Sequence, residues 1–373
     1  MQVNKMFNSE KVFRLGELFC GPGGIALGAL KARAIKDNVV WRIEHAWAND
    51  YDSDTCDTYI HNICPDNSNS VIYGDVKKLN IKSLPPIDAF AYGFPCNDFS
   101  IVGEQKGFDG EFGPLYSYGV KVIDCFKPKF FFAENVGGIR NANEGKAFSK
   151  ILSDLKNAGR GYKLTIHLYK FEEYGVPQAR HRVIIVGLEN TLGLTYHVPA
   201  PTHKNKAVCV REALKCPPIP KVAPNQEITA QSRTVVERLK YIKPGENCWN
   251  ADLPKSLQLN VKGAKLSQIY RRLHPDKPSY TITGSGGGGT HGYHWEEPRA
   301  LTNRERARLQ TFPDKYLFKG SKESARKQIG MAVSPLISEV VFNSILMTLA
   351  GIEYPSIEPS IENQIELFEE VLA

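Results

Sequence analysis

The sequence lacks the features that mark membrane, secreted and zinc-binding proteins. No stretch approaches the roughly 18 consecutive apolar residues that a membrane span needs. The N-terminus has scattered charges and no apolar segment before a small-residue cleavage site, so no secretory signal is expected. The eight cysteines include no CxxC pair, which argues against a disulfide framework and a zinc ribbon in a chain of 373 residues. The simplest interpretation is a reduced, soluble, cytoplasmic protein.

Acidic residues are scarce outside the C-terminus. Residues 351–373 carry six Glu and no Lys or Arg, so 47 basic and 34 acidic residues remain in 1–350, a net charge of +13. A body this basic favours a polyanionic partner such as nucleic acid, although a solvated basic surface accounts for the charge equally well. The acidic tail, residues 352–373, is interpreted as a solvated extension. The near-helical apolar spacing of its last residues leaves a short docking helix as the alternative.

The first half of the chain alternates between short β-rich runs and helix-like stretches. Such alternation indicates βαβ units and a mostly parallel sheet covered on both faces, which is a doubly wound α/β domain. From about residue 200 to 300 the sequence becomes rich in Pro, Gly, Lys and Asn, which predicts a second, smaller, loop-rich domain. Strands are expected at 12–19, 44–49, 70–75, 87–94, 128–135, 163–170 and 182–188. Helices are expected at 24–35, 53–63, 115–126, 147–159, 303–312 and 336–351, the last returning to the first domain.

Glycines and acids follow the first three expected strands. The glycine turn at 18–24 opens the first helix, but its spacing is not the full GxGxxG, which weakens a nicotinamide or flavin interpretation. Asp50 ends the second strand, where a carboxylate can take ribose hydroxyls, and Tyr51 offers a ring face to an adenine. Asp75 ends the third strand and can accept from an exocyclic amine. Because open α/β sheets bind ligands at the carboxyl ends of their strands, the three together predict a nucleoside site.

The later strand ends carry groups that could react. Cys96 leaves the fourth strand for a polar, glycine-containing loop, where a thiolate can meet a substrate, whereas the other seven cysteines are adequately explained as buried small hydrophobes. Glu134 ends the next strand on the same rim, and a salt-bridged strand-end carboxylate is its plainer interpretation. If residues 178–182 are extended, Arg180 and Arg182 point to one face, towards a phosphate or a carboxylate.

In order along the chain, these motifs resemble those of the C5-cytosine DNA methyltransferases of bacterial restriction–modification systems. The resemblance covers about residues 13–350, everything except the termini. It implies a Rossmann-like catalytic domain at 1–203 completed by 315–351, a target-recognition domain at 204–300 and a hinge segment at 301–314. The motifs are FxGxGG at 19–24, the acid Asp50, GD at 74–75, GFPC at 93–96, ENV at 134–136, QxRxR at 178–182, RRL…TIT at 271–283, LTNRERARLQTFPD at 301–314 and GxxV at 330–333.

The resemblance implies a mechanism that these residue types can perform. The target cytosine would flip out of the duplex. Cys96 would add to C6 as a thiolate, while Glu134 would hydrogen-bond the N3 edge and the exocyclic amine. C5 would then take the methyl group of S-adenosylmethionine, and loss of the C5 proton would expel the cysteine. Arg182 would hold the pyrimidine O2, and Arg180 would organise Cys96 and nearby phosphates.

The resemblance also assigns binding residues, without a metal. The expected S-adenosylmethionine site consists of Phe19, Gly21, Gly23, Gly24, Asp50, Tyr51, Asp75, Val76, Pro95, Leu115 and Met331. The loop at 100–113 is similar to the mobile catalytic loop that closes over DNA, and its glycines suit a hinge-bearing lid. The segment 286–293 is the candidate for close approach to bases, with a flexible surface loop as the equal alternative. The expected DNA contacts are Asn97, Ser100, Gln105, Lys106, Lys262, Arg271, Arg272, Gly287 and Thr290.

The chain departs from the family pattern at three positions. Asn97 stands where Gln is usual after the nucleophile, which bears on how the flipped base enters and leaves. Phe112 stands where Arg commonly precedes the last glycine of the catalytic loop, which removes one DNA contact. Met331 replaces the Asn of the usual GNAV, which bears on the affinity for the cofactor.

The leading hypothesis is a monomeric, site-specific enzyme that acts on duplex DNA, with no membrane partner and with a restriction endonuclease for the same site as a possible partner. An RNA-cytosine methyltransferase on the same scaffold is the first alternative, although its better-known relatives carry a Cys-Phe-Thr segment that this chain lacks. A nucleic-acid-binding protein that no longer reacts is the second. A Rossmann oxidoreductase would leave GFPC, ENV and QARHR unexplained. The recognition sequence cannot be derived from motif spacing.

Overall fold

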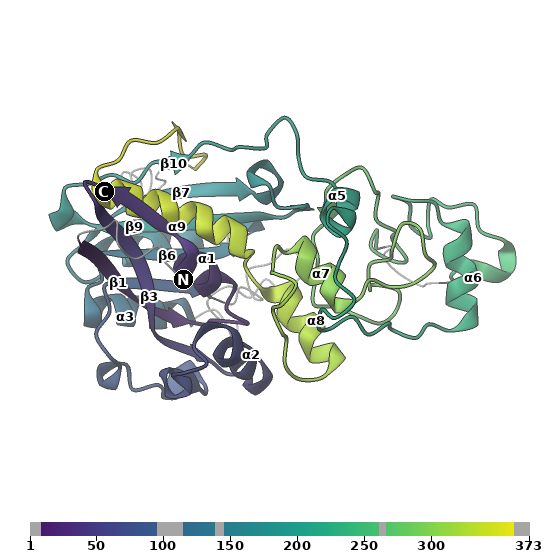
Figure 1. The fold of residues 1–373 in the computed structure, drawn as a ribbon, viewed down its shortest axis with the longest axis horizontal. Helices are drawn as coiled ribbons and strands as arrows, with labels where there is room; N and C mark the ends of the chain where they lie inside the picture. Colours follow the sequence, from purple (N-terminus) through teal and green to yellow (C-terminus); the bar gives the residue numbers. More distant parts are fainter. Residues whose placement is uncertain (1–8, 95–114, 139–144, 261–265, 362–373) are drawn as a thin grey trace. The chain divides into compact units, whose positions relative to one another are not determined.

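The computed structural model describes residues 9–94, 115–138, 145–260 and 266–361 (Figure 1). The chain divides into two compact units. Unit 1 comprises Met1–Lys170, His181–Pro201 and Pro335–Ala373, and unit 2 comprises Phe171–Arg180 and Thr202–Ser334. The functional boundaries expected from the sequence stay a prediction.

Unit 1 is built on a mixed, mostly parallel sheet in the order β2-β3-β1-β5-β6-β9-β7, with β4 paired to β3. Strand β1 runs parallel to β3 and β5, β3 to β4, and β5 to β6, whereas β9 is antiparallel to both β6 and β7. The predicted α/β class is therefore confirmed. The strands are β1 Ser9–Leu18, β2 Arg33–Lys36, β3 Val39–Asp50, β4 Val71–Tyr73, β5 Ala89–Gly93, β6 Phe130–Val136, β7 Tyr162–Lys170 and β9 His181–Glu189.

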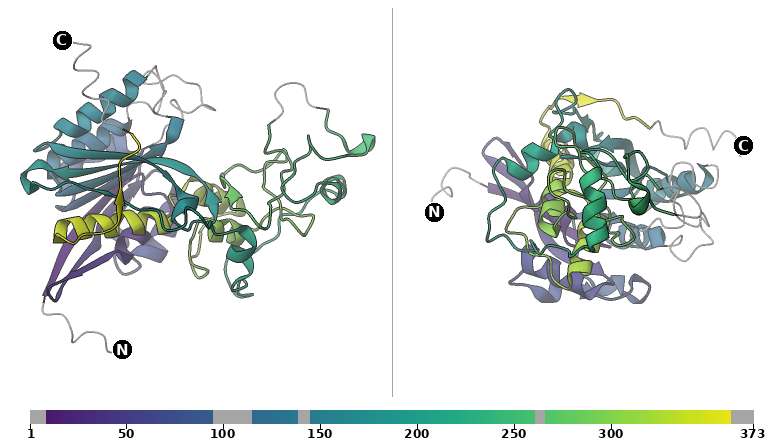
Figure 2. Two further views of the ribbon diagram at one scale, coloured as in Figure 1. Left: turned by 90° about the horizontal axis from the view of Figure 1, so that it is seen from above. Right: turned by 90° about the vertical axis from the view of Figure 1, so that its right-hand side faces the viewer.

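Helices cover both faces of this sheet, as Figure 2 shows for α9 on one side and the blue helices α3 and α4 on the other. The alternation of side chains along β6 explains why both faces are apolar. Phe130 and Phe132 contact Phe342 of α9, the latter stacked at 5.3 Å, while Phe131 belongs to the core formed with Phe148 of α4. The helices of unit 1 are α1 Gly24–Lys31, α2 Ser53–Ile63, α3 Tyr116–Phe126, α4 Lys146–Asn157 and α9 Pro335–Ala350.

Helix α9 packs directly on α1, and one glycine makes that contact possible. A Cβ on Gly28 would overlap the carbonyl of Pro335 and the side chain of Ser338. The apolar segment 322–350, which contains α9, is long enough to cross a membrane, but 72% of its most apolar window is buried inside the protein, as in a core helix. Helix α9 belongs to unit 1.

The expected helix 24–35 is wrong over its last third, residues 32–35. Helix α1 ends at Lys31, and β2 then pairs antiparallel with β3. The turn between them uses Asp37 and Asn38, both with positive φ of 50° and 59°. Asp and Asn tolerate this left-handed conformation better than most residues, so a tight hairpin forms where helical spacing alone predicted more helix.

The acidic tail is not simply a solvated extension. Strand β12 (Ser356–Ile357) pairs with β10 (Val198–Pro199), and Ile361 is buried in the core of unit 1. The Ser360 hydroxyl accepts from the Leu168 N–H of β7 at 2.9 Å. Residues 352–361 are therefore anchored, and the alternative of a docking helix falls in 362–373, outside the described residues.

Unit 2 is loop-rich, as predicted, and buried arginines replace part of its missing secondary structure. The Arg272 guanidinium donates to the carbonyls of Leu239, Ile242, His294 and Trp295 at 2.5–3.0 Å. Helix α8, which the sequence analysis missed, packs against α7. The regular elements of unit 2 are β8 Gln178–Ala179, β11 Ser279–Tyr280, α5 Val210–Lys215, α6 Arg233–Tyr241, α7 Asn303–Leu309 and α8 Lys322–Met331.

Short 3-10 turns occur in both units. They lie at Ser68–Ser70, Val76–Lys78, Ile81–Ser83, Phe171–Tyr174, Asn190–Leu192 and Lys255–Leu257.

Candidate active site

The carboxyl ends of the parallel strands meet at one edge of the unit 1 sheet. Leu18 at the end of β1 pairs with Asn49 of β3 on one side and with Tyr92 of β5 on the other. Gly93 of β5 pairs with Glu134 of β6. The residues that follow these strands therefore lie along one rim, as the sequence analysis expected.

The turn after β1 is shaped by positive φ angles and closed by Asp50. Phe19, Gly21 and Gly23 have φ of 53°, 55° and 86°, and Gly23 caps the start of α1. The Gly21 N–H donates to the Asp50 carboxylate at 3.0 Å. A Cβ on Gly21 would meet nothing within 4 Å, so the turn presents bare backbone to open space. Bare backbone beside an acid suits a ligand that must approach the main chain closely.

Asp50 is 8% exposed, and burial raises the pKa of its carboxyl group, while the N–H groups of Asp52 and Gly21 oppose the shift. The Asp52 N–H donates to its other oxygen at 3.1 Å. Beside it the Tyr51 side chain is 59% exposed, so its ring is accessible. One carboxylate thus fixes the turn and retains lone pairs for a hydroxyl donor.

The remaining expected cofactor residues of unit 1 fall on or near the same rim. Asp75 is exposed after β4, where its side chain accepts from the Lys77 N–H at 2.9 Å, and Val76 is buried behind it. The side-chain amide of Asn49 donates to the carbonyls of Ile72 and Gly74, which ties β3 to β4. Leu115 is buried and precedes α3, and Gly24 is buried at the start of α1.

Glu134 and Arg182 form an ion pair across neighbouring strands. Arg182 Nε lies 3.0 Å from Glu134 Oε1, and the two side chains are 15% and 12% exposed. Glu134 Oε2 would lie 3.3 Å from a Cβ on Gly93, so the bare glycine leaves room beside the carboxylate. The side-chain amide of Asn135 donates to the Phe94 carbonyl at 3.2 Å. Asn135 thus fixes the chain just before Pro95 and Cys96, which lie outside the described residues together with Asn97, Ser100, Gln105, Lys106 and Phe112.

Arg180, the first arginine of the expected pair, belongs to unit 2. Arg180 is 3% exposed, and its Nη1 donates to the carbonyls of Ile282 and Gly330 at 3.2 Å. Because Arg180 and Arg182 belong to different units, the expectation that they face one ligand stays a prediction. In the structure as described, Arg180 donates to the carbonyl of Ile282 and to that of Gly330 in α8, both in unit 2. Met331, also in unit 2, is 53% exposed.

Gln178 is a residue of this motif that the site prediction omitted. Its side chain is fully buried and donates to the Leu309 carbonyl and the Gln310 side chain, and it accepts from the Ile282 N–H at 2.8 Å. The signal was its place in QxRxR, but a buried glutamine cannot be told from an exposed one by spacing.

The expected DNA contacts have different outcomes. Arg272 is 6% exposed and gives its N–H groups to backbone carbonyls, and its contact with phosphate stays a prediction. Arg271 lies over the Tyr280 ring at 4.6 Å and lines a pocket of about 310 Å³ with His274 and Lys277. Gly287 is exposed with φ of 111°, and the Thr290 hydroxyl donates to its carbonyl at 2.9 Å. Lys262 lies outside the described residues.

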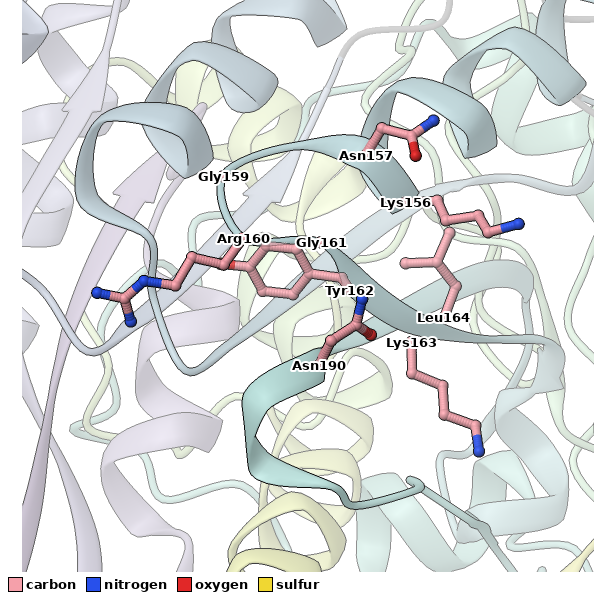
Figure 3. Close-up of a pocket in the computed structure, with 9 residues that line it drawn as sticks. All are labelled: Lys156, Asn157, Gly159, Arg160, Gly161, Tyr162, Lys163, Leu164 and Asn190. Carbon is pink, nitrogen blue, oxygen red and sulfur yellow. The ribbon is translucent and has the colours of Figure 1, made fainter.

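A pocket of about 600 Å³ lies away from this rim (Figure 3). It surrounds the start of β7, where Tyr162 pairs with Glu189 at the end of β9. Arg182 lies at the other end of β9, so the pocket belongs to the opposite edge of the sheet. Within the part of the chain that the structure describes, no three His, Cys, Asp or Glu side chains gather as metal ligands. The pocket is lined by Lys156, Asn157, Gly159, Arg160, Gly161, Tyr162, Lys163, Leu164 and Asn190.

Comparison with known proteins gives concordant results. The sequence profile described as C-5 cytosine-specific DNA methylase matches residues 13–347. Type II methyltransferase M.BbvI of Brevibacillus brevis is 60% identical over 352 residues, which is 92% of this chain and 94% of that protein. Type II methyltransferase M.NgoFVII of Neisseria gonorrhoeae is 39% identical, with 90% and 86% covered.

Solved structures agree on the fold. The crystal structure of a DNA modification methyltransferase encoded within an E. coli prophage superposes with a TM-score of 0.70 at 23% identity, covering 90% of this chain and 99% of that chain. The S. pombe Dnmt2 methyltransferase gives a TM-score of 0.54 at 16% identity, covering 91% and 99%.

Proposed function

The chain belongs to the C-5 cytosine-specific DNA methylase family, and we propose that it methylates one cytosine within a specific duplex DNA sequence through a covalent cysteine adduct. It is a C5-cytosine DNA methyltransferase of the Type II restriction–modification kind. The observation that carries the finer proposal is the Glu134–Arg182 ion pair at the end of neighbouring strands. A carboxylate and a guanidinium side by side can recognise the N3, amine and O2 edge of a cytosine.

The rim of unit 1 fits S-adenosylmethionine as the methyl donor. The bare turn at Gly21 lets a ligand approach the protein backbone closely, and the buried Asp50 can accept from ribose hydroxyls. The exposed Tyr51 ring suits the face of an adenine, and Asp75 can accept from its amine. When bound, S-adenosylmethionine supplies an electrophilic methyl group. Pro95, Leu115 and Met331 complete the proposed site.

In the proposed reaction, the Cys96 thiolate forms a bond to C6 of the flipped cytosine, and the electron pair of the C5–C6 double bond moves to C5. Glu134 holds the N3 edge and the exocyclic amine, which favours this electron-rich ring, while Arg182 binds O2. C5 would then form its bond to the methyl group while the bond from that group to the sulfonium sulfur breaks, with S-adenosylhomocysteine as the leaving group. A base removes the C5 proton, the double bond re-forms and the bond from sulfur to C6 breaks. Arg180 is proposed to support the approach of Cys96 rather than to react.

The proposed partner is duplex DNA, bound by a monomer whose basic body of +13 attracts phosphates. The proposed contacts are Asn97, Ser100, Gln105, Lys106, Lys262, Arg271, Arg272, Gly287 and Thr290. An endonuclease that cuts the same sequence would complete a restriction–modification pair. The methyltransferase itself would act in the cytoplasm, at the nucleoid.

The deciding experiment incubates the protein with labelled S-adenosylmethionine and mixed genomic DNA, and then maps 5-methylcytosine at base resolution. Methylation confined to one short sequence is expected. No incorporation with intact cofactor binding would redirect the proposal to RNA, and tRNA is the substrate to test next.

The nucleophile is tested separately by Cys96→Ser. We expect this variant to lose methyl transfer while it retains DNA binding, because the serine hydroxyl is far less acidic than a thiol. A variant that methylates at the unsubstituted rate would refute the assignment of Cys96.

A further inference from the structure

Two arginines of unit 2 are buried without the hydrogen bonds that buried arginines need. Arg306 of α7 is 2% exposed and Arg326 of α8 is 7% exposed. Nε and Nη2 of Arg306 and Nε of Arg326 are buried, and no acceptor among the described residues bonds them. The two helices pack against each other (Figure 1). Unsatisfied donors on two neighbouring cations indicate a missing acceptor.

Two other buried arginines of the same unit each donate to several backbone carbonyls. Arg304, two residues before Arg306, donates to the carbonyls of Pro224 and Pro313 at 3.0 and 2.9 Å, and also to that of Tyr316. Arg272 is saturated in the same way. Unit 2 therefore satisfies a buried guanidinium with loop carbonyls where the arginine serves the fold. Arg306 and Arg326 depart from that rule.

Among the described residues, the carboxylates next to the pair compensate it poorly. Glu305, next to Arg306, is taken by Arg299 at 2.8 Å, and Glu323 is 65% exposed and 3.9 Å from Arg326. Burial lowers the pKa of Arg306 to about 10, with a contribution from Arg326. Burial and the two arginines lower the pKa of His291 to about 4, so this ring is neutral at pH 7. Uncompensated buried cations are costly, and an anion would remove the cost.

Glycine backbone covers Arg326. The glycine segment (residues 284–289) passes over Arg326, where a Cβ on Gly286 would overlap the guanidinium. Gly287 and Gly288 have φ of 111° and 53° and face open space, and residues 285–288 are exposed. A cover that carries no bulky side chain can shift at little steric cost and lets an anion approach closely.

We propose that Arg306 and Arg326 bind one backbone phosphate of the substrate DNA beneath the glycine segment, which moves aside to admit it. Two guanidinium groups match the oxygens of a phosphate, and each unsatisfied donor gains an acceptor. The contact positions the duplex and carries no sequence information. This inference rests on the proposed function only for the identity of the anion as DNA.

The first test measures the affinity for a duplex carrying the methylated sequence as a function of salt, for the unsubstituted protein, Arg306→Met and Arg326→Met. Each substitution should weaken binding by about tenfold, because a charge-assisted contact is lost. Because the two arginines share one phosphate, each substitution should also lower the slope of log affinity against log salt by at most about 0.9, the effect of one phosphate. Lys221→Gln, which removes an exposed cation of the same unit, is the control and should leave the slope nearly unchanged.

The second test replaces single phosphates of that duplex by neutral methylphosphonates. One position should weaken binding to the unsubstituted protein and have no further effect on Arg306→Met. The melting temperature of Arg306→Met should not fall, since the substitution removes an uncompensated buried charge. If the methionine variant does not fold, Arg306→Lys keeps the charge but loses the Nε and Nη2 donors, and it is expected to show the same loss at the same position.

Two results would overturn the inference. Variants that bind with the unsubstituted affinity and slope would remove the phosphate site while the proposed function stands. An unsubstituted protein that neither binds nor methylates DNA would refute the proposed function and the phosphate site together.

Discussion

The sharpest consequence of the site geometry concerns Glu134→Gln. The substitution keeps the shape of the side chain and removes one charge of an ion pair whose members are only 12% and 15% exposed. A hydrogen bond to a charged group is worth about 1.5–3 kcal/mol, and about 1.4 kcal/mol corresponds to tenfold in rate. If the carboxylate holds the cytosine during methyl transfer, kcat should fall by about 10- to 150-fold from this bond alone.

The assay is transfer of labelled methyl to the mapped DNA sequence, with cofactor affinity and melting temperature measured in parallel. Glu189→Gln is the matched control. Glu189 is 4% exposed, lies at the far end of β9 and pairs with Arg160 at 2.8 Å, so it loses the same kind of bond at the opposite edge of the same sheet. It should retain full activity. Methyl transfer by Glu134→Gln within about threefold of the unsubstituted rate would refute the reasoning, as would an equal loss in both variants.

Two further substitutions test the buried acids near β1. Asp50→Asn keeps only one side-chain oxygen for the N–H groups of Gly21 and Asp52, so the affinity for S-adenosylmethionine should weaken about tenfold by calorimetry; an unchanged affinity would contradict the proposed role. Burial raises the pKa of Glu17 well above its ordinary value of 4.5, so its neutral form contributes stability that is present below pH 4.5 and is lost as pH rises through the raised pKa. Glu17→Gln retains an acceptor for the Tyr59 hydroxyl, so its free energy of unfolding should decline less as pH rises above 4.5. An unaltered decline would exclude Glu17 as the cause of this pH dependence.

The fold was predictable wherever packing and local spacing agree. The Phe130–Phe132 run predicts a strand with both faces buried, and the structure places its rings alternately towards α9 and towards α4. The helical spacing that predicted a helix over 24–35 failed beyond Lys31, because the turn at Asp37 and Asn38 pairs β2 with β3 instead. Periodicity reports which side chains are apolar, and it does not report a hairpin that tertiary pairing stabilises.

Helix α8 was missed for a related reason. Its buried face includes Arg326 and Gln328, which are polar, so no apolar stripe marks it in the sequence. A helix that serves only the fold rarely buries an arginine, so the residue that hides α8 from prediction is unusual in itself. A polar residue on a buried helix face is therefore informative once the structure is known, although it is misleading before.

The arginines show where sequence spacing reaches its limit. Arg271 and Arg272 are adjacent and chemically identical, yet the guanidinium of Arg271 lies over the Tyr280 ring and that of Arg272 is buried and donates to four backbone carbonyls. Arg180 and Arg182 are two residues apart, yet one serves the loops of unit 2 and the other pairs with Glu134 in unit 1. These roles differ in the number of hydrogen-bond acceptors around each guanidinium, and that number cannot be derived from the spacing of residues in the sequence. By this criterion Arg272 and Arg304 serve the fold, whereas Arg306, which no motif singled out, has donors that await an anion.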